Sequence, residues 1–471
     1  MSEALELDDI QGLVARGYGG LPEASFVLLE IADAVQARGW LSGLAGRVTA
    51  GSVRPDERAV HVAIAAGGLA KLGLPPEALA SFPLELREGM TTEFRQRILG
   101  DVDASAPETW RWGGPTTRPV DMVLLLYARG RQELSALYEE EHAGFMAGGL
   151  HEIEVLDTST LTDREHFGFR DGISQPTVEG LGREDVPANT VKAGEFVLGY
   201  QNEYEKYTDR PTVPASADPH GLLPSHPDDS ALHDLGRNGS YLVMRQMSQD
   251  VRGFWRFVAG ACPGPDGASD PEAATRLAAK MVGRWPDGAP VTVSPDRDDP
   301  ALSDLNDFGY GNEDGDGLHC PIGAHVRRTH PRDSLDPDPG TDRSIEIDKR
   351  HRLLRRGRAY GPTVPPEERL LDAVDDEPRG LHFIVLCANI VRQFEFVQHT
   401  WVNNPKFDGL YEDVDPLVGR RDAAGATFTI PGTPVRERIT GIPSFVTVRG
   451  GGYFFLPGLR ALRYLANLPL L

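Results

Sequence analysis

Cysteine is scarce in this sequence. The 471 residues contain three, Cys262, Cys320 and Cys387, which stand far apart. An odd number of cysteines without C-x-x-C spacing excludes a disulfide framework and a cysteine-based zinc motif. Unpaired cysteines are typical of a reducing compartment, so we expect a cytoplasmic protein.

The chain also lacks an excess of positive charge and any long apolar run. It has 48 Lys and Arg against 70 Asp and Glu, which gives a formal net charge of −22. Because nucleic acids and anionic membranes require basic patches, we expect neither as a partner. The first residues, M-S-E-A-L-E-L-D-D, are acidic where a secretory signal is basic and then apolar. No run approaches the roughly 18 apolar residues of a membrane span.

The first half alternates strand-like and helix-like segments. β-Branched and aromatic runs predict strands, and apolar residues at helical spacing predict helices. The expected strands are 25–31, 59–65, 122–128 and 151–156, and the expected helices are 33–44 and 132–142, with an irregular excursion from 69. The order β-α-β, insertion, β-α-β is the split pattern of a ferredoxin-like domain, an antiparallel sheet with helices on one face.

The second half repeats this theme without evident sequence repetition. The stretch 211–229 is rich in Pro, Ser, Asp and His and predicts a surface loop, so we expect domains at 1–230 and 231–471. The expected strands are 240–246 and 382–387, the expected helices are 251–261, 272–282 and 389–402, and 445–448 with 453–456 are expected to form a closing hairpin around three glycines. The predicted fold class is α+β, with two ferredoxin-like domains.

Three residue types in this chain suggest chemistry at a bound oxygen. His325 follows Pro321 and Gly323 in a turn that can present its ring to a planar cofactor, and imidazole is a common ligand of haem iron. Arg355 lies in an apolar and basic run, where a permanent charge can stabilise a developing anion. Taken alone, a histidine beside arginines is more often an ordinary surface or half-buried residue.

Asp171 is the third candidate, in H-F-G-F-R-D-G-I-S-Q-P. Gly168 and Gly172 permit tight turns, and the neighbouring Phe167, Phe169 and Ile173 are apolar. A carboxyl in such surroundings can be poised for proton transfer. The alternative is that Asp171 only stabilises a D-G turn.

This segment resembles the G-x-x-D-G signature of the dye-decolorizing peroxidases, haem enzymes built from two ferredoxin-like domains. Further motifs resemble the longer bacterial and fungal-type members and occur in the same order along nearly the whole chain. They are D-I-Q-G-L, G-E-F-V-L-G-Y-Q-N-E-Y, G-S-Y-L-V-M-R-Q, C-P-I-G-A-H-V-R-R-T, L-L-R-R-G and R-Q-F-E-F-V-Q.

The resemblance implies a peroxidase with haem b bound mainly in the C-terminal half. It places His325 as the axial iron ligand, and Asp171 and Arg355 as the distal acid-base residue and distal arginine. Asp171 would move a proton between the oxygens of hydrogen peroxide, and Arg355 would stabilise the charge that develops. The implied electron donors are phenolic, dye-like or other small aromatic molecules. Arg327, Phe383 and Asn389 are expected at the cofactor.

Asn389 is a departure from the family, because members often supply an aspartate as the acceptor for the ligand's second ring N–H. We therefore expect Asn389 to bond His325 and to give a relatively high iron reduction potential. His330 is a second departure, expected at the surface or beside a haem propionate.

Several other features have competing interpretations. Trp255, Trp401 and Tyr360 are candidates for relaying electrons to the surface, although amphipathic packing more often explains such aromatics. The N-E-D-G-D-G stretch at 312–317 lacks the spacing of a calcium loop, which favours a solvated loop. Two other functions stay open, a haem carrier or sensor without turnover and a non-haem protein on the same scaffold. The sequence leaves the oligomeric state open.

Overall fold

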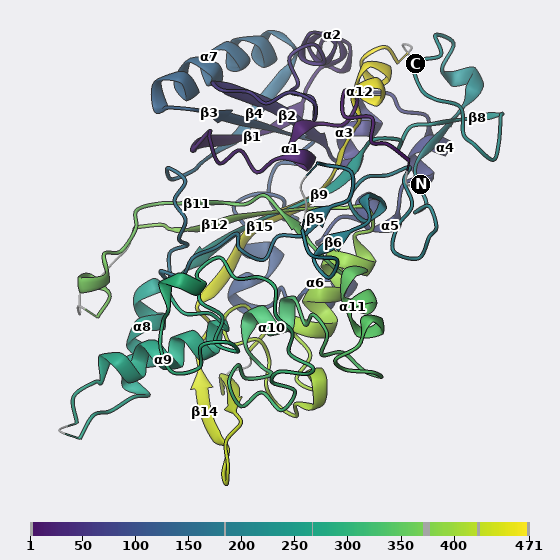
Figure 1. The fold of residues 1–471 in the computed structure, drawn as a ribbon. Coiled ribbons are helices and arrows are strands. Elements are labelled where there is room, and N and C mark those ends of the chain that lie inside the picture. The colour runs from purple at the N-terminus through teal and green to yellow at the C-terminus, as the bar shows by residue number, and fades with distance from the viewer. Residues whose placement is uncertain (1–2, 183–184, 266, 371–376, 422–423, 469–471) are drawn as a thin grey trace.

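The computed structural model describes residues 3–182, 185–265, 267–370, 377–421 and 424–468. Within these residues a single nine-stranded sheet runs through the molecule in the order β10-β12-β9-β15-β2-β3-β1-β4, with β11 also paired to β12 (Figure 1). Strands from the N-terminal half form one end of this sheet, and strands from the C-terminal half form the other. The expected α+β class is confirmed.

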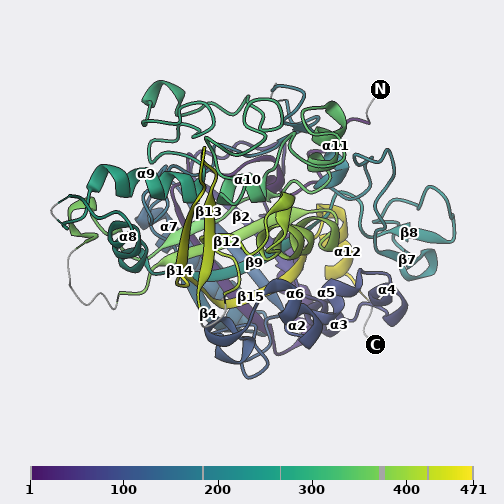
Figure 2. The ribbon, with the colours of Figure 1, turned by 90° about the horizontal axis from the view of Figure 1, so that it is seen from below.

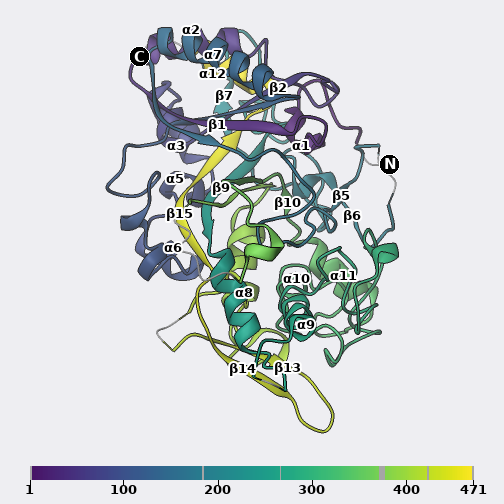
Figure 3. The same cartoon turned by 90° about the vertical axis from the view of Figure 1, so that its left-hand side faces the viewer.

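The N-terminal strands follow the predicted β-α-β, insertion, β-α-β order. The elements are β1 (Glu23–Ile31), α2 (Ala34–Leu44), β2 (Arg58–Ile64), β3 (Met122–Ala128), α7 (Arg131–Ala147) and β4 (Leu150–Asp157). Their order in the sheet is β2-β3-β1-β4, and all neighbours are antiparallel. Helices α2 and α7 cover the outer face of these strands (Figures 1 and 3). The insertion holds α3 (Ala66–Lys71), α4 (Pro76–Ala80), α5 (Leu84–Glu88) and α6 (Glu93–Leu99).

The C-terminal half uses the same strand order. Its strands are β9 (Ser240–Gln249), β10 (Leu354–Arg355), β11 (Arg358–Tyr360), β12 (Gly380–Cys387) and β15 (Val446–Leu456), and its first helices are α8 (Val251–Gly260) and α9 (Pro271–Val282). Taken in chain order, the short pair β10 and β11 corresponds to β2, β12 to β3, β9 to β1 and β15 to β4. Two ferredoxin-like units are therefore present.

The two units join where β15 meets β2, with Phe455 opposite Ile64. The expected boundary near residue 230 lies between two short antiparallel strands, β7 (Thr212–Pro214) and β8 (Leu232–Asp234), and stays a prediction. The remaining elements are α1 (Gly12–Ala15), β5 (Thr177–Val178), β6 (Thr190–Val191), α10 (His325–Thr329), α11 (Asp342–Lys349), β13 (Ala426–Ile430), β14 (Glu437–Ile442) and α12 (Leu459–Ala466). The β13–β14 hairpin projects from the end opposite α2 (Figure 3), and seen from below it lies toward the viewer in front of the sheet (Figure 2).

The central strands are buried on both faces. Val27 and Leu29 of β1 belong to one apolar core, and the alternating Phe26 and Leu28 belong to a second core on the opposite face. Successive side chains of a strand point to opposite faces, so a strand covered on both sides is a continuous apolar run. This is the pattern that made these strands predictable. No helix in the described residues is long and apolar enough to span a membrane.

The predicted closing hairpin is wrong. Residues 446–456 form one long strand, β15, that pairs with β9 along its length and contains a register shift between Val448 and Gly450. A Cβ on Gly450 would lie 2.5 Å from Nε1 of Trp112. The glycines therefore allow close packing in a strand instead of forming a turn.

The predicted helix at 389–402 is confirmed in position but not in type. It consists of two wide-turn π-helical segments, Val391–Glu395 and Val397–Val402. Such segments are rare and often border functional sites. Phe394 and Val397 line the cavity described next.

Candidate active site

A cavity of about 360 Å³ lies beside the C-terminal strands, enclosed by loops and helices from before and after them in the chain. Both halves contribute to its wall, and most of its lining is apolar. It brings together Asp171, His325, Arg355 and Phe383 from the sequence prediction. Arg327 and Asn389 are not among the lining residues.

His325 begins α10 and lies at the cavity wall. Its Nδ1 is 2.8 Å from Oδ2 of Asp415, whose other oxygen accepts hydrogen bonds of 2.9 Å from the backbone N–H groups of Leu417 and Val418. Burial opposes protonation of the ring, but the charge of Asp415 raises the pKa of His325. Burial also opposes ionisation of Asp415, and the nearby His325 nevertheless lowers its pKa. The contact fixes the ring and leaves Nε2 for a ligand.

The expected role of Asn389 is wrong. Its side-chain oxygen accepts from the backbone N–H of Arg392 at 2.9 Å and so starts the wide-turn helix. The carboxylate of Asp415 takes the place beside His325 that we assigned to this amide. The reason given for a high reduction potential therefore disappears. Asp415 lies 90 residues beyond His325, and no local sequence pattern connects the two.

Asp171 and Arg355 meet across the two halves. Nη1 of Arg355 donates to Oδ1 of Asp171 at 2.7 Å, and the backbone N–H of Gly172 donates to the same oxygen at 2.6 Å. Gly172 has φ +86°, which places its amide in the left-handed region that glycine readily adopts. Burial opposes ionisation of Asp171, but Arg355, Gly172 and the more distant His325 together lower its pKa. The carboxyl is held as an ionised base.

One group of lining residues is strongly polar. His330 is buried, lies 3.2 Å from Asp348, and burial lowers its pKa to about 3. Arg352 donates to the carbonyl of Ser174 and to Oδ1 of Asn189, and burial lowers its pKa to about 10. Nδ1 of His330 and Nη1 of Arg352 make no hydrogen bond within the described residues. The expected surface position of His330 is therefore wrong.

Arg327 has a structural role instead of the expected contact with a cofactor. Its fully buried guanidinium donates to the carbonyls of Asp314 and Cys320 at 2.9 and 3.0 Å. The carboxylate of Asp314 accepts from the backbone N–H groups of His319 and Cys320. The acidic stretch 312–317 is thus held by hydrogen bonds from Arg327 and from the backbone that follows it. In the described parts of the chain no group of three His, Cys, Asp or Glu residues is placed to hold a metal ion.

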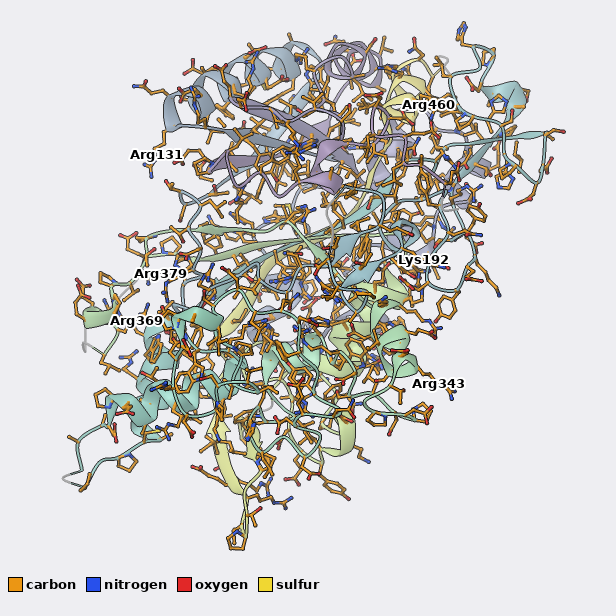
Figure 4. All side chains as sticks on the ribbon, in the orientation of Figure 1. Arg131, Lys192, Arg343, Arg369, Arg379 and Arg460 are labelled. Carbon is orange, nitrogen blue, oxygen red and sulfur yellow. The ribbon has the colours of Figure 1, made fainter. Side chains whose placement is uncertain are left out.

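The three aromatic residues that we considered as an electron relay are almost fully buried. The exposed fractions of Trp255, Trp401 and Tyr360 are 8%, 5% and 9%. Trp255 stacks on Phe169 at the cavity wall, with ring centroids 6.4 Å apart, and Arg369 covers its ring at 5.2 Å. Arg369 is labelled in Figure 4. A relay through these residues stays a prediction.

No family model matches the chain. The multifunctional dye peroxidase DyP2 of Amycolatopsis sp. is 30% identical over 98% of this chain and 96% of that protein. A dye-decolorizing peroxidase of Mycena epipterygia is 33% identical over 64% of this chain, and the chain covers only 57% of that relative and 55% of one from Exidia glandulosa.

Solved structures of dye-decolorizing peroxidases also resemble this chain. A dye-decolorizing peroxidase in complex with 2,6-dimethoxyphenol has a TM-score of 0.78 at 26% identity, covering 98% of this chain and 100% of that one. AauDyP complexed with imidazole has a TM-score of 0.80 at 25% identity, with the same coverage. Fold and cavity define a two-domain ferredoxin-like protein with a histidine and an Asp–Arg pair at one internal site. The chain belongs to the dye-decolorizing peroxidase family.

Proposed function

We propose that this protein is a haem peroxidase that reduces hydrogen peroxide with electrons from phenolic, dye-like or other small aromatic donors. The observation that carries the proposal is the Asp171–Arg355 pair at 2.7 Å, at the wall of the cavity that His325 also lines. Binding a cofactor requires neither Asp171 nor Arg355. The pair therefore favours turnover over a haem carrier or sensor.

The residues present fit haem b. The His325 ring is oriented by Asp415 and has one nitrogen left for iron. Leu381, Phe383 and Leu417 supply apolar wall for a flat ring. Within the described residues, the cavity-lining His330 and Arg352 have buried nitrogen atoms without hydrogen bonds, which suits the carboxylates of haem. We assign His325 to the iron and these two residues to the carboxylates.

When bound, haem would supply an iron that binds peroxide and would store the two oxidising equivalents of peroxide until the donors reduce it. Asp171 is ionised, so its carboxylate can accept a proton from the inner peroxide oxygen. It then returns this proton to the outer oxygen, which leaves as water. Arg355 stabilises the negative charge that develops as the O–O bond breaks. The fixed Arg355 guanidinium also holds Asp171 in place.

The donor class rests partly on a relative. A dye-decolorizing peroxidase of similar fold has been solved in complex with 2,6-dimethoxyphenol. Extended to this chain, that complex supports phenolic donors. We also propose a cytoplasmic location, because the three cysteines are unpaired.

Stopped-flow mixing of the haem-loaded ferric protein with hydrogen peroxide tests the proposal. We expect a rapid Soret change that a phenolic donor reverses. His325→Ala should lose the axial ligand and change the spectrum of the resting protein. A Soret band that peroxide leaves unaltered would favour the carrier or sensor, and the absence of any Soret band would favour a non-haem protein.

A further inference from the structure

Arg355 lies on β10, a strand at the edge of the sheet that the described residues form. Among the described residues, strand β10 is at the end of the sheet and pairs with β12 alone, with Arg355 opposite Val385. The next residue, Arg356, donates its backbone N–H to the carbonyl of Ile384. Backbone groups of an antiparallel strand alternate between its two sides, so the N–H and C=O of Arg355 point away from β12.

The side chain of Gln175 occupies the side of β10 that faces away from β12. Its Oε1 accepts from the backbone N–H of Arg355 at 3.0 Å, and its Nε2 donates to the carbonyl of Arg355 at 3.2 Å. One amide therefore makes both hydrogen bonds that a further strand would make. We call this pair of hydrogen bonds to the Arg355 backbone the clasp. The guanidinium of Arg355 meanwhile donates to Asp171.

Gln175 is itself fixed to the rest of the site. The side-chain amide of Asn189 donates to the backbone carbonyl of Gln175 at 3.2 Å, and Arg352 donates to the side-chain oxygen of Asn189 at 2.9 Å. Gln175 follows Asp171 by four residues on the same loop. The clasp therefore joins the loop that carries the carboxylate to the strand that carries the guanidinium.

We propose that Gln175 is a positioning residue that sets the distance between Asp171 and Arg355 by clasping the Arg355 backbone. The inference rests on the proposed peroxidase function. No proton or electron passes through Gln175. A displacement of about 1 Å between reacting groups can cost up to roughly a hundredfold in rate, so a lost clasp should be visible in turnover.

Gln175→Met tests the clasp, because methionine keeps the length of the side chain and loses both hydrogen bonds. We expect kcat/KM for peroxide to fall by about tenfold to a hundredfold, with KM for a phenolic donor unchanged. Amide hydrogen exchange at Arg355 should accelerate, and this readout requires no turnover. Gln175→Glu keeps the acceptor for the Arg355 N–H and should restore part of the slow exchange.

Gln11 provides a matched control. Its amide also clasps a strand backbone, accepting from the N–H of Val62 at 3.2 Å and donating to the Val62 carbonyl at 2.9 Å. It is buried but does not line the cavity. Gln11→Met should lower stability and leave kcat/KM for peroxide unchanged.

Faster exchange at Arg355 with kcat/KM within twofold of the parent would overturn the positioning role. Unchanged exchange would overturn the clasp itself. If Gln175→Met does not fold, Gln175→Glu decides by the same two readouts. A parent protein that does not react with peroxide would refute the proposed function, whereas the exchange measurement would still report the clasp.

Discussion

Two Asp–Arg pairs connect the N-terminal half to the C-terminal half at the wall of the same cavity. Asp171 pairs with Arg355, and their side chains are 45% and 31% exposed. Asp101 pairs with Arg245 of β9, and their side chains are 2% and 4% exposed. The two pairs have the same chemistry, yet the environment shifts the pKa of the two carboxyls in opposite directions.

Hydrogen bonding and solvation explain the difference. Burial opposes ionisation of both carboxyls, but Arg355, Gly172 and His325 together overcome it at Asp171 and lower its pKa. At Asp101 burial outweighs the help of Arg245 and raises the pKa, and Oδ2 has no hydrogen-bond partner within the described residues. The first pair is therefore suited to proton transfer and the second to holding the two halves together.

The largest effect that separates the pairs is expected at Asp171. Asp171→Asn removes the base and keeps the shape, so kcat/KM for peroxide should fall by about 10²–10⁴-fold. The free energy of unfolding should change by no more than about 1 kcal/mol, because the pair is partly exposed. Steady-state kinetics and urea unfolding measure the two quantities. A variant that keeps parental kinetics would remove Asp171 from the mechanism.

At Asp101 the large effect is expected on the free energy of unfolding instead of on the rate. Asp101→Ala leaves the Arg245 guanidinium buried without a counter-charge, which typically costs about 3–5 kcal/mol of unfolding free energy. Urea unfolding measures this loss, and Asp101→Asn should lose less because an amide oxygen can still accept from Arg245. If Asp101→Ala unfolds like the parent, the assignment of this pair to stability is incorrect.

The sequence predicted most of the strands because they are continuous apolar runs between turn residues. The prediction failed at β15, where Gly450 was expected in a turn. Gly450 instead lies in the strand, so close to Trp112 that a Cβ there would be 2.5 Å from the indole nitrogen. Local pattern cannot distinguish these two uses of glycine.

The sequence predicted the site residues that stand in recognisable motifs. It did not predict those that reach the site only through contacts between distant parts of the chain. His325, Asp171 and Arg355 stand in recognisable motifs, and the cavity brings them together. Asp415 and Gln175 act through contacts across 90 and 180 residues of chain, which no spacing rule predicts. Asn389 was misassigned because matching it to the position of the family's aspartate could not show which side chain reaches the His325 ring.

The smallest difference should appear in the pH dependence of the peroxide reaction. Asp171 must be ionised to act as a base, so the rate is lost as the pH falls through its lowered pKa. Arg355 is the main group that lowers this pKa, so Arg355→Leu should move the acidic limb to higher pH. Arg355→Lys keeps a positive charge and should shift the limb less, although it loses the forked geometry. A limb at the same pH in the parent and in Arg355→Leu would show that another group controls the ionisation, and the contrast with Asp101 would then rest on burial alone.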